Sequence, residues 1–193
     1  MKRYIVAIAA LSIAGFFVTE RARPQAAADP DKQLVNDLVV ANRALSSDEI
    51  GFLDTGGHVS VRSATNPNHY YISRWVAPGM VTADSIIEYD LDSKPVKGDR
   101  KDQYLERFMH GEVYKARPDV NAIVHGHTPE LVAFGDSSVP LATYDRNKGG
   151  YVSLGLNIFD VRKFNGGFPG IEETPALGKA TAQALGQKSA VLL

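Results

Sequence analysis

The sequence predicts an α/β or α+β domain, in which helices form layers against a β-sheet. Segments with apolar residues at helical spacing alternate along the chain with segments in which apolar and polar residues alternate. Several of the strand-like segments also follow one another as adjacent pairs. With 193 residues, of which 44% are hydrophobic, the chain is long enough for one domain with a sizeable core.

The first 28 residues have the pattern of a secretory signal peptide. Two basic residues precede an apolar run from Tyr4 to Val18, and three consecutive alanines end at Ala28. This run is shorter than the roughly 20 residues that a spanning helix needs, although the charged residues after it keep an uncleaved anchor open as the alternative. We expect cleavage after Ala28, a mature domain over residues 29–193, and a periplasmic or secreted protein with no stable membrane association.

Four segments beyond this leader are predicted to be helices. The first, DKQLVNDLVVANRALSS, has apolar residues at helical spacing. The second runs from Lys101 to Ala116 and stops before an Arg-Pro pair, because proline disfavours helix in the residue before it. The other two begin at Thr128 and Thr174, where a threonine able to cap a helix precedes a proline suited to the first turn, and the last is expected to end near Leu185.

Five segments are predicted to be strands, in chain order HVSVR, HYYIS, SIIEYDL, NAIVHGH and SAVLL. The first of them follows a Gly-Gly turn. The apolar run of the fourth implies burial up to Val124, and the fifth is expected to be a buried strand. Because a domain rarely stops on the last apolar residue of a strand, Leu193 suggests a domain that is incomplete at its C-terminus.

Composition narrows the kinds of partner and of chemistry. The formal net charge is -1 and the basic residues are not clustered, which argues against a nucleic-acid partner and favours a small molecule. The absence of cysteine excludes disulfides, thiolate nucleophiles and cysteine zinc sites. Any metal must therefore be held by histidines and carboxylates.

The run NAIVHGH places His125 and His127 two residues apart, so that in a strand both side chains point to one face. Glu106 and His110 are four residues apart and share one face of the preceding helix, which could bring Glu106 toward the two histidines. Neutral imidazole and carboxylate ligands suit zinc and related divalent ions. The alternative is a solvated histidine pair, with Glu106 on the surface and His110 as a hydrogen-bonded, half-buried residue.

Three stretches resemble the class II aldolase/adducin family: TGGHVSVR, YLERFMHGEVYKARPDVNAIVHGH and, more weakly, ALGQKSAVLL. The resemblance implies a three-layer α/β/α sandwich, Zn2+ or another divalent ion such as Mn2+ as cofactor, and a homotetramer. It also implies that His125 and His127 are two of three zinc-binding histidines, and that Glu106 is the catalytic acid/base that can also touch the metal. The family's third histidine follows the strand that SAVLL resembles, so we expect it beyond Leu193; completion of the coordination by His58 or Glu106 is the alternative.

The sequence departs from the sugar-phosphate aldolases of this family at three positions. Those enzymes share two serines and an asparagine that hold phosphate. At the matching positions this chain has Tyr104, Leu105 and His58. A bulky aromatic ring cannot replace hydroxyl donors to a phosphate dianion, which favours a non-phosphorylated substrate. The closer resemblance is to the dihydroxyphthalate decarboxylase-like subgroup, whose substrates carry a carboxylate and neighbouring oxygens.

These features predict a metal-dependent carbon–carbon lyase that acts on a small oxygenated or carboxylated substrate, by aldol cleavage or decarboxylation through a metal-stabilised enolate. Gly57 and His58, at the turn, are expected to bind substrate, because glycine lets the backbone approach closely; a plain hairpin turn is the alternative. Arg74 is the candidate partner for a carboxylate, or else an exposed arginine. The alternative function is a non-catalytic, adducin-like binding or structural module that has lost a metal ligand.

Overall fold

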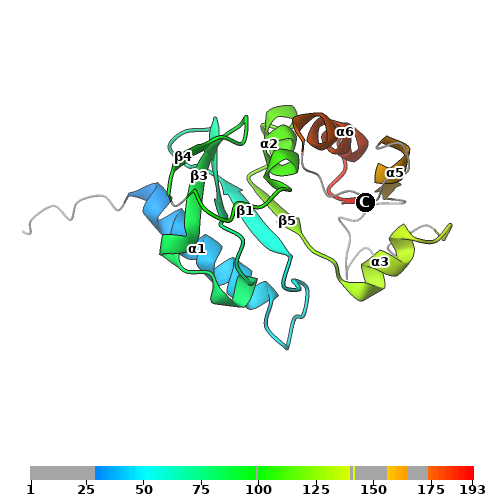
Figure 1. Cartoon of the computed structure of the whole chain (residues 1–193), viewed down its shortest axis with the longest axis horizontal. Helices are drawn as coiled ribbons and strands as arrows, with labels where there is room; N and C mark the ends of the chain where they lie inside the picture. The colour runs from blue at the N-terminus through cyan, green and yellow to red at the C-terminus, as the bar shows by residue number, and fades with distance from the viewer. Residues whose placement is uncertain (1–28, 99, 140, 142–155, 165–173) are drawn as a thin grey trace, which may run out of the picture.

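The computed structural model of the protein describes residues 29–98, 100–139, 141, 156–164 and 174–193 (Figure 1). In this part of the chain the helices are α1 (Pro30–Leu45), α2 (Arg107–Ala116), α3 (Pro129–Gly135), α5 (Val161–Phe164) and α6 (Pro175–Leu185). The strands are β1 (His58–Arg62), β2 (His69–Ser73), β3 (Ile86–Asp90), β4 (Pro95–Lys97), β5 (Ala122–His125), β6 (Asn157–Ile158) and β7 (Val191–Leu192), with short 3-10 turns at Pro78–Met80 and Ala83–Ser85. The expected signal peptide lies outside the described residues.

The fold has three layers around a five-stranded sheet. Its strand order is β4-β3-β2-β1-β5, and all neighbours are antiparallel. Figure 1 shows α1 on one side of this sheet, whereas α2 lies on the other with α6 packed beside it. The predicted α/β class and the three-layer α/β/α sandwich are confirmed.

The two faces of the sheet carry separate parts of the core, because side chains alternate along each strand. One face packs Val59, Tyr71 and Ile86 against Leu38 and its neighbours on α1. The other face packs a group of buried side chains under α2: Tyr70, Ile72, Ile87, Tyr89, Tyr104 and Tyr114. The alternation therefore fixes which residues of β1 can meet α2, and His58 and Ser60 are on that face.

The helix starts follow the local sequence signals. Asp29 caps α1, with its carboxylate accepting from the backbone N–H of Asp31 at 3.1 Å, and Thr174 caps α6 by accepting from Leu177 N–H at 3.2 Å. Thr128 also precedes its helix as predicted, but its hydroxyl donates to the carbonyl of Phe52 at 3.2 Å. No helix among the residues described is both long and apolar enough to cross a membrane.

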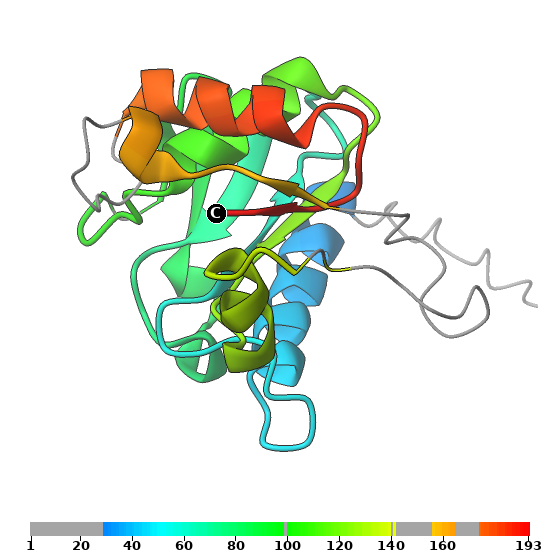
Figure 2. The same cartoon turned by 90° about the vertical axis from the view of Figure 1, so that its right-hand side faces the viewer.

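Three expectations about individual elements need correction. The helix expected from Lys101 begins only at Arg107, after a turn that tucks the Tyr104 ring into the core. The strand expected to be buried up to Val124 is the edge strand β5, where the Val124 side chain is 44% exposed. The last strand, β7, is half-buried and pairs in parallel with β6 in a separate two-stranded sheet, which lies between α6 and α3 (Figure 2).

Candidate functional site

The candidate site lies at one end of the central sheet. β5 ends at His125, and β1 begins at His58, which pairs directly with His125 across the antiparallel ladder. The residue before α2, Glu106, reaches the same end of the sheet from the helical layer. The Gly56-Gly57 turn precedes β1 here, so the turn, the histidine pair and the glutamate come together from three different elements.

The side chains of His125 and His127 converge as the strand period predicted. Their Nε2 atoms are 3.1 Å apart and their rings meet edge to face. Two nitrogens that each lie about 2.0–2.1 Å from one zinc ion at tetrahedral angles would be about 3.3 Å apart, so this pair is nearly set for a shared ion. Burial, with the neighbouring His127 adding to it, lowers the pKa of His125 to about 4, which keeps the imidazole neutral and able to bind metal at pH 7.

Asp54 orients the second histidine, and sequence reasoning missed this residue. Its carboxylate oxygens lie 3.1 and 3.2 Å from Nδ1 of His127, and one of them also accepts from the N–H of Gly57 at 2.8 Å. Partial burial raises the pKa of Asp54, but the hydrogen bonds from His127 and the turn outweigh it and lower the pKa overall. A proton held at Nδ1 leaves the Nε2 lone pair free, as metal-binding histidines require.

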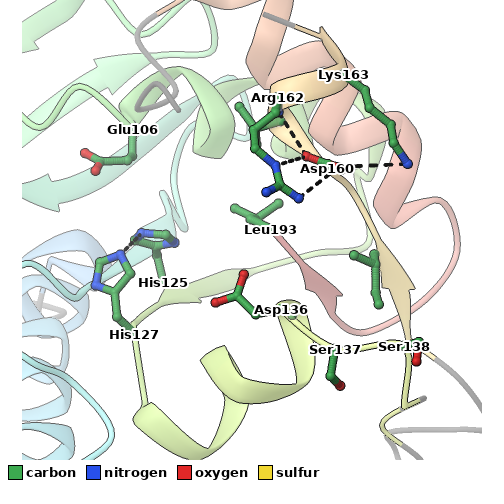
Figure 3. Close-up of a pocket in the computed structure, with 13 residues that line it drawn as sticks. Glu106, His125, His127, Asp136, Ser137, Ser138, Asp160, Arg162, Lys163 and Leu193 are labelled. Carbon is green, nitrogen blue, oxygen red and sulfur yellow. Dashed lines mark hydrogen bonds and ion pairs between the residues drawn. The ribbon is translucent and has the colours of Figure 1, made fainter. Parts of the chain in front are cut away.

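A cavity of about 860 Å³ opens beside this pair (Figure 3). Glu106, His125 and His127 lie on one side of it. The other walls come from the end of α3, from β6 and α5, and from Leu193: Gly135, Asp136, Ser137, Ser138, Ile158, Asp160, Val161, Arg162 and Lys163. Among the described residues, no three His, Asp or Glu side chains are gathered closely enough to hold a metal ion, and the cavity is lined by the two histidines together with the carboxylate of Glu106.

His58 is brought beside the pair but not into the cavity. Its ring is fully buried, with Nδ1 3.0 Å from the carbonyl of Gly56 and Nε2 3.0 Å from Nε2 of His110. Both ring nitrogens are therefore engaged inside the protein, and neither is placed to contact a substrate or to serve as a third metal ligand. Burial lowers the pKa of His58 to about 3, so the ring is neutral at pH 7.

The buried ring belongs to a hydrogen-bonded chain with one possible direction. Because the Gly56 carbonyl only accepts, His58 donates from Nδ1, and its Nε2 must accept the proton of His110 Nε2. His110 Nδ1 then accepts from Ser60 Oγ at 2.6 Å, and Ser60 Oγ accepts from the hydroxyl of Tyr114 at 2.8 Å. Every polar group in this chain is satisfied, which explains why fully buried histidines are tolerated.

The remaining predicted positions lie outside the cavity. Gly57 is buried in the turn, where an added Cβ would be 2.9 Å from Leu53 Cδ2 and 3.1 Å from the carbonyl oxygen of His125. Arg74 is half-exposed at the end of β2, with Nη1 3.9 Å from the carboxylate of Asp102. Tyr104 is buried, and its hydroxyl donates to the carbonyl of Val76 at 3.0 Å.

Comparisons with known proteins give a consistent family. Residues 36–193 match the family model described as the class II aldolase and adducin N-terminal domain. The decarboxylase tropJ of Talaromyces stipitatus is 32% identical over 114 residues, which cover 58% of this chain and 42% of that protein. The methylthioribulose-1-phosphate dehydratase of Gluconacetobacter diazotrophicus is 36% identical over 103 residues, which cover 52% and 47%. The matched parts thus span about half the length of these two relatives.

Solved structures share the fold. YgbL from Escherichia coli superposes with a TM-score of 0.64 at 13% identity, covering 84% of this chain and 75% of that one. The L-fuculose-1-phosphate aldolase of Thermus thermophilus gives a TM-score of 0.62 at 21% identity, with the same coverage of 84% and 75%. At such low identities these likenesses establish the architecture alone.

Proposed function

We propose that the chain, which belongs to the class II aldolase and adducin N-terminal domain family, is a metal-dependent carbon–carbon lyase. Its relatives include a decarboxylase, which breaks a carbon–carbon bond, and a dehydratase, which is a lyase of another kind. Its substrate is a small, non-phosphorylated molecule that carries a carboxylate or neighbouring oxygens. The fragment released is either an aldehyde or carbon dioxide. We extend the proposal to export of the mature domain and to a homotetrameric assembly.

The convergence of His125 and His127 is the observation that carries this proposal. Their Nε2 atoms point to one place at the edge of a large cavity, and the Asp54 carboxylate holds the Nδ1 side of His127. A solvated histidine pair has no need of an orienting carboxylate, whereas a metal-binding histidine commonly has one. Glu106, in the same cavity, is the candidate for the third ligand.

Cleavage of a carbon–carbon bond beside a carbonyl or phenol leaves negative charge on carbon, and the site offers two means of handling it. A divalent ion at the histidine pair would polarise the neighbouring oxygen as a Lewis acid. Glu106, which lines the cavity without belonging to the internal hydrogen-bonded chain, is placed to deliver or remove the proton. His125 and His127 bind and orient, and Asp54 keeps the His127 lone pair available.

The absence of a phosphate subsite in the described turn supports a non-phosphorylated substrate. The hydroxyl of Tyr104 is committed to the carbonyl of Val76, and both ring nitrogens of His58 are committed to Gly56 and His110. None of these groups is free to donate to a phosphate dianion.

One observation keeps a non-catalytic module as the second candidate. Only two histidines converge in the described part of the chain, and a catalytic zinc commonly has three protein ligands. An adducin-like binding module that has lost metal would retain the fold, and it would have no use for Glu106 in the cavity.

Zinc titration against a chromophoric chelator tests the proposal. We expect the chain to bind zinc weakly, and to lose more than 10-fold of that affinity in His125→Ala and in His127→Ala, because each change removes one nitrogen ligand. His69→Ala is the matched control, since its ring is on β2 and bonds to Glu88 rather than facing the cavity. Zinc affinity that is indifferent to both cavity histidines would support the non-catalytic module.

A further inference from the structure

The two histidines of the candidate site are held in different ways. His127 is oriented by a hydrogen bond, because its Nδ1 lies 3.1 Å from the Asp54 carboxylate. Within the described part of the chain, the ring of His125 has a hydrogen-bond contact at Nε2, toward His127, and none at Nδ1. The orientation of the His125 ring therefore has to come from packing, and the ring packed beside it is that of His58.

His58 lies directly across the antiparallel ladder from His125. The two residues are register partners of β1 and β5, and their ring centroids are 5.2 Å apart with 42° between the ring planes. This separation is within the range at which aromatic rings pack favourably. The ring of His125 thus contacts one histidine that lines the cavity and another that is fully buried.

The His58 ring is fixed by its other neighbours. Its centroid is 4.0 Å from that of the buried Tyr104 ring and 4.9 Å from that of His110. Its Nδ1 is bonded to the carbonyl of Gly56 and its Nε2 to Nε2 of His110, each at 3.0 Å. Turning the ring over would break both bonds and leave buried polar groups unpaired, which is strongly unfavourable. The ring therefore has one orientation.

The nitrogens and the ring face of His58 meet different needs. The nitrogens satisfy the buried hydrogen-bonded chain, since the proton at His110 Nε2 needs an acceptor. The ring face supplies the surface against which His125 packs. A side chain with only one of these two properties would meet only one need, so the two contributions can be separated by substitution.

We propose that His58 is a positioning residue, whose buried ring holds the ring of His125 at the angle where its Nε2 meets that of His127. It acts through His125 and touches neither substrate nor metal. This inference rests on the proposed function, because it gives the metal-binding pair a second support beside Asp54. It assigns a role to a histidine whose nitrogens are both engaged inside the protein.

Two variants separate the ring from its nitrogens. His58→Gln keeps an amide that can accept from His110 but has no ring, whereas His58→Phe keeps a ring that cannot hydrogen-bond. Cobalt(II) is the probe: titration gives its affinity, and its visible d–d absorption reports the geometry of the ligands. We expect His58→Gln to weaken cobalt binding about 10-fold and to change the absorption bands, as the loss of a support for a metal ligand does. His58→Phe should keep the affinity and the bands of the wild type, although its urea midpoint falls.

Ser60→Ala is the control, because it breaks the same buried chain at Nδ1 of His110, away from the contact between His58 and His125. It should lower the urea midpoint while cobalt affinity and absorption bands stay as in the wild type. A merely structural role predicts the opposite order, with cobalt affinity following stability. If His58→Phe and Ser60→Ala lose more affinity than His58→Gln, the positioning role is overturned.

His125→Ala distinguishes the failure of this inference from the failure of the lyase proposal. If His125→Ala loses cobalt binding and His58→Gln binds like the wild type, the positioning role fails while the metal site stands. If the wild type takes up no cobalt, or binds it no better than His125→Ala does, the metal-dependent lyase proposal fails and the positioning role fails with it. Far-UV circular dichroism checks that each variant is folded, and His58→Met, which also lacks a ring, carries the same expectation if His58→Gln is unfolded.

Discussion

Asp54 is the residue that most sharply distinguishes a built metal site from two histidines that happen to be close. It accepts from His127 Nδ1 and from the backbone of Gly57, so it ties the turn to the tautomer of the histidine. We expect Asp54→Asn to weaken zinc binding by about 10- to 100-fold, because outer-shell partners of metal ligands have effects of that size. Asp48→Asn removes the same charge from an exposed position in the segment before the turn and should leave zinc affinity unchanged. Equal zinc affinity in the two variants would refute the orienting role.

The buried histidines make the stability of the metal-free chain depend on pH. Burial lowers the pKa of His58 to about 3 and that of His110 well below its ordinary value, whereas histidine in the unfolded chain titrates near 6.5. Below that pH the unfolded chain takes up protons that the folded chain does not. The contribution of these two buried rings to the free energy of unfolding is therefore complete above about pH 6.5 and is lost as the pH falls. We expect urea unfolding to show a loss of roughly 1 kcal/mol per buried histidine between pH 7 and 5.5.

Two glutamine variants isolate this effect. His110→Gln should lower stability at pH 7 but flatten its pH dependence, since one titrating group is gone. Asn36→Gln, at an exposed position of α1, removes no titrating group and should keep the wild-type slope between pH 7 and 5.5. A slope that is unchanged in His110→Gln would show that other groups govern the pH dependence.

The sequence predicted the convergence of the two histidines because its signal is local, and it missed Asp54 because that contact is tertiary. His125 and His127 are two residues apart in an extended segment that starts as β5, so their common direction follows from the period of extended backbone even though β5 itself ends at His125. Asp54 is 73 positions from His127, and an aspartate beside two glycines is equally typical of an ordinary turn.

At the scale of elements, α2 and α6 approach so closely that one glycine decides their packing. A Cβ on Gly178 of α6 would lie 2.6 Å from the carbonyl oxygen of Phe108 and 2.9 Å from the backbone N of Met109. Helix propensity alone predicts that Gly178→Ala stabilises the chain by about 1 kcal/mol. We expect the opposite, a net loss of about 1 kcal/mol or more, because the clash is with backbone and overpacking costs about 1–3 kcal/mol. Thermal unfolding measures this, and a raised midpoint would mean that the helices separate freely.

Lys179→Ala is the control for that comparison. Lys179 is exposed on the same helix, and a surface substitution of this kind usually changes stability by less than about 0.5 kcal/mol. A loss confined to Gly178→Ala therefore assigns the effect to the contact between the two helices.

A helix or strand was predicted correctly where the residues that determine it lie within the segment itself. Helix α6 begins at the capping threonine and ends at Leu185 as its sequence indicates. The burial of Val124 was wrong because an apolar run shows that a strand exists but not whether it has a neighbour on both sides. The late start of α2 has a similar cause: Tyr104 is anchored by the carbonyl of Val76, a contact that the periodicity of the helix does not contain.

At the scale of the whole molecule, the antiparallel sheet determines why distant residues meet. The end of β5, the start of β1 and the end of β2 lie at the same end of the sheet, because each strand runs antiparallel to its neighbour. The sheet topology therefore brings the histidine pair and the glycine turn together, although they are far apart in the sequence. The candidate site therefore needs the whole folded sheet, and the boundary of the folded domain can be tested directly.

The contacts at the start of α1 set the last prediction. Asp29 caps α1, and the Asp31 carboxylate accepts from the N–H of Ala64 at 2.7 Å and from the Ser63 hydroxyl at 2.9 Å. We therefore expect residues 29–193 to unfold at the same temperature as the full chain and to bind zinc equally well. Residues 32–193, which lack both aspartates, should unfold several degrees lower, since a lost helix cap costs about 1 kcal/mol and each kcal/mol shifts the midpoint by about 2–4 °C at this size. Equal midpoints for 29–193 and 32–193 would show that these aspartates do not anchor the domain. N-terminal sequencing of exported protein should start at Asp29. Retention of Met1 would contradict the expected cleavage.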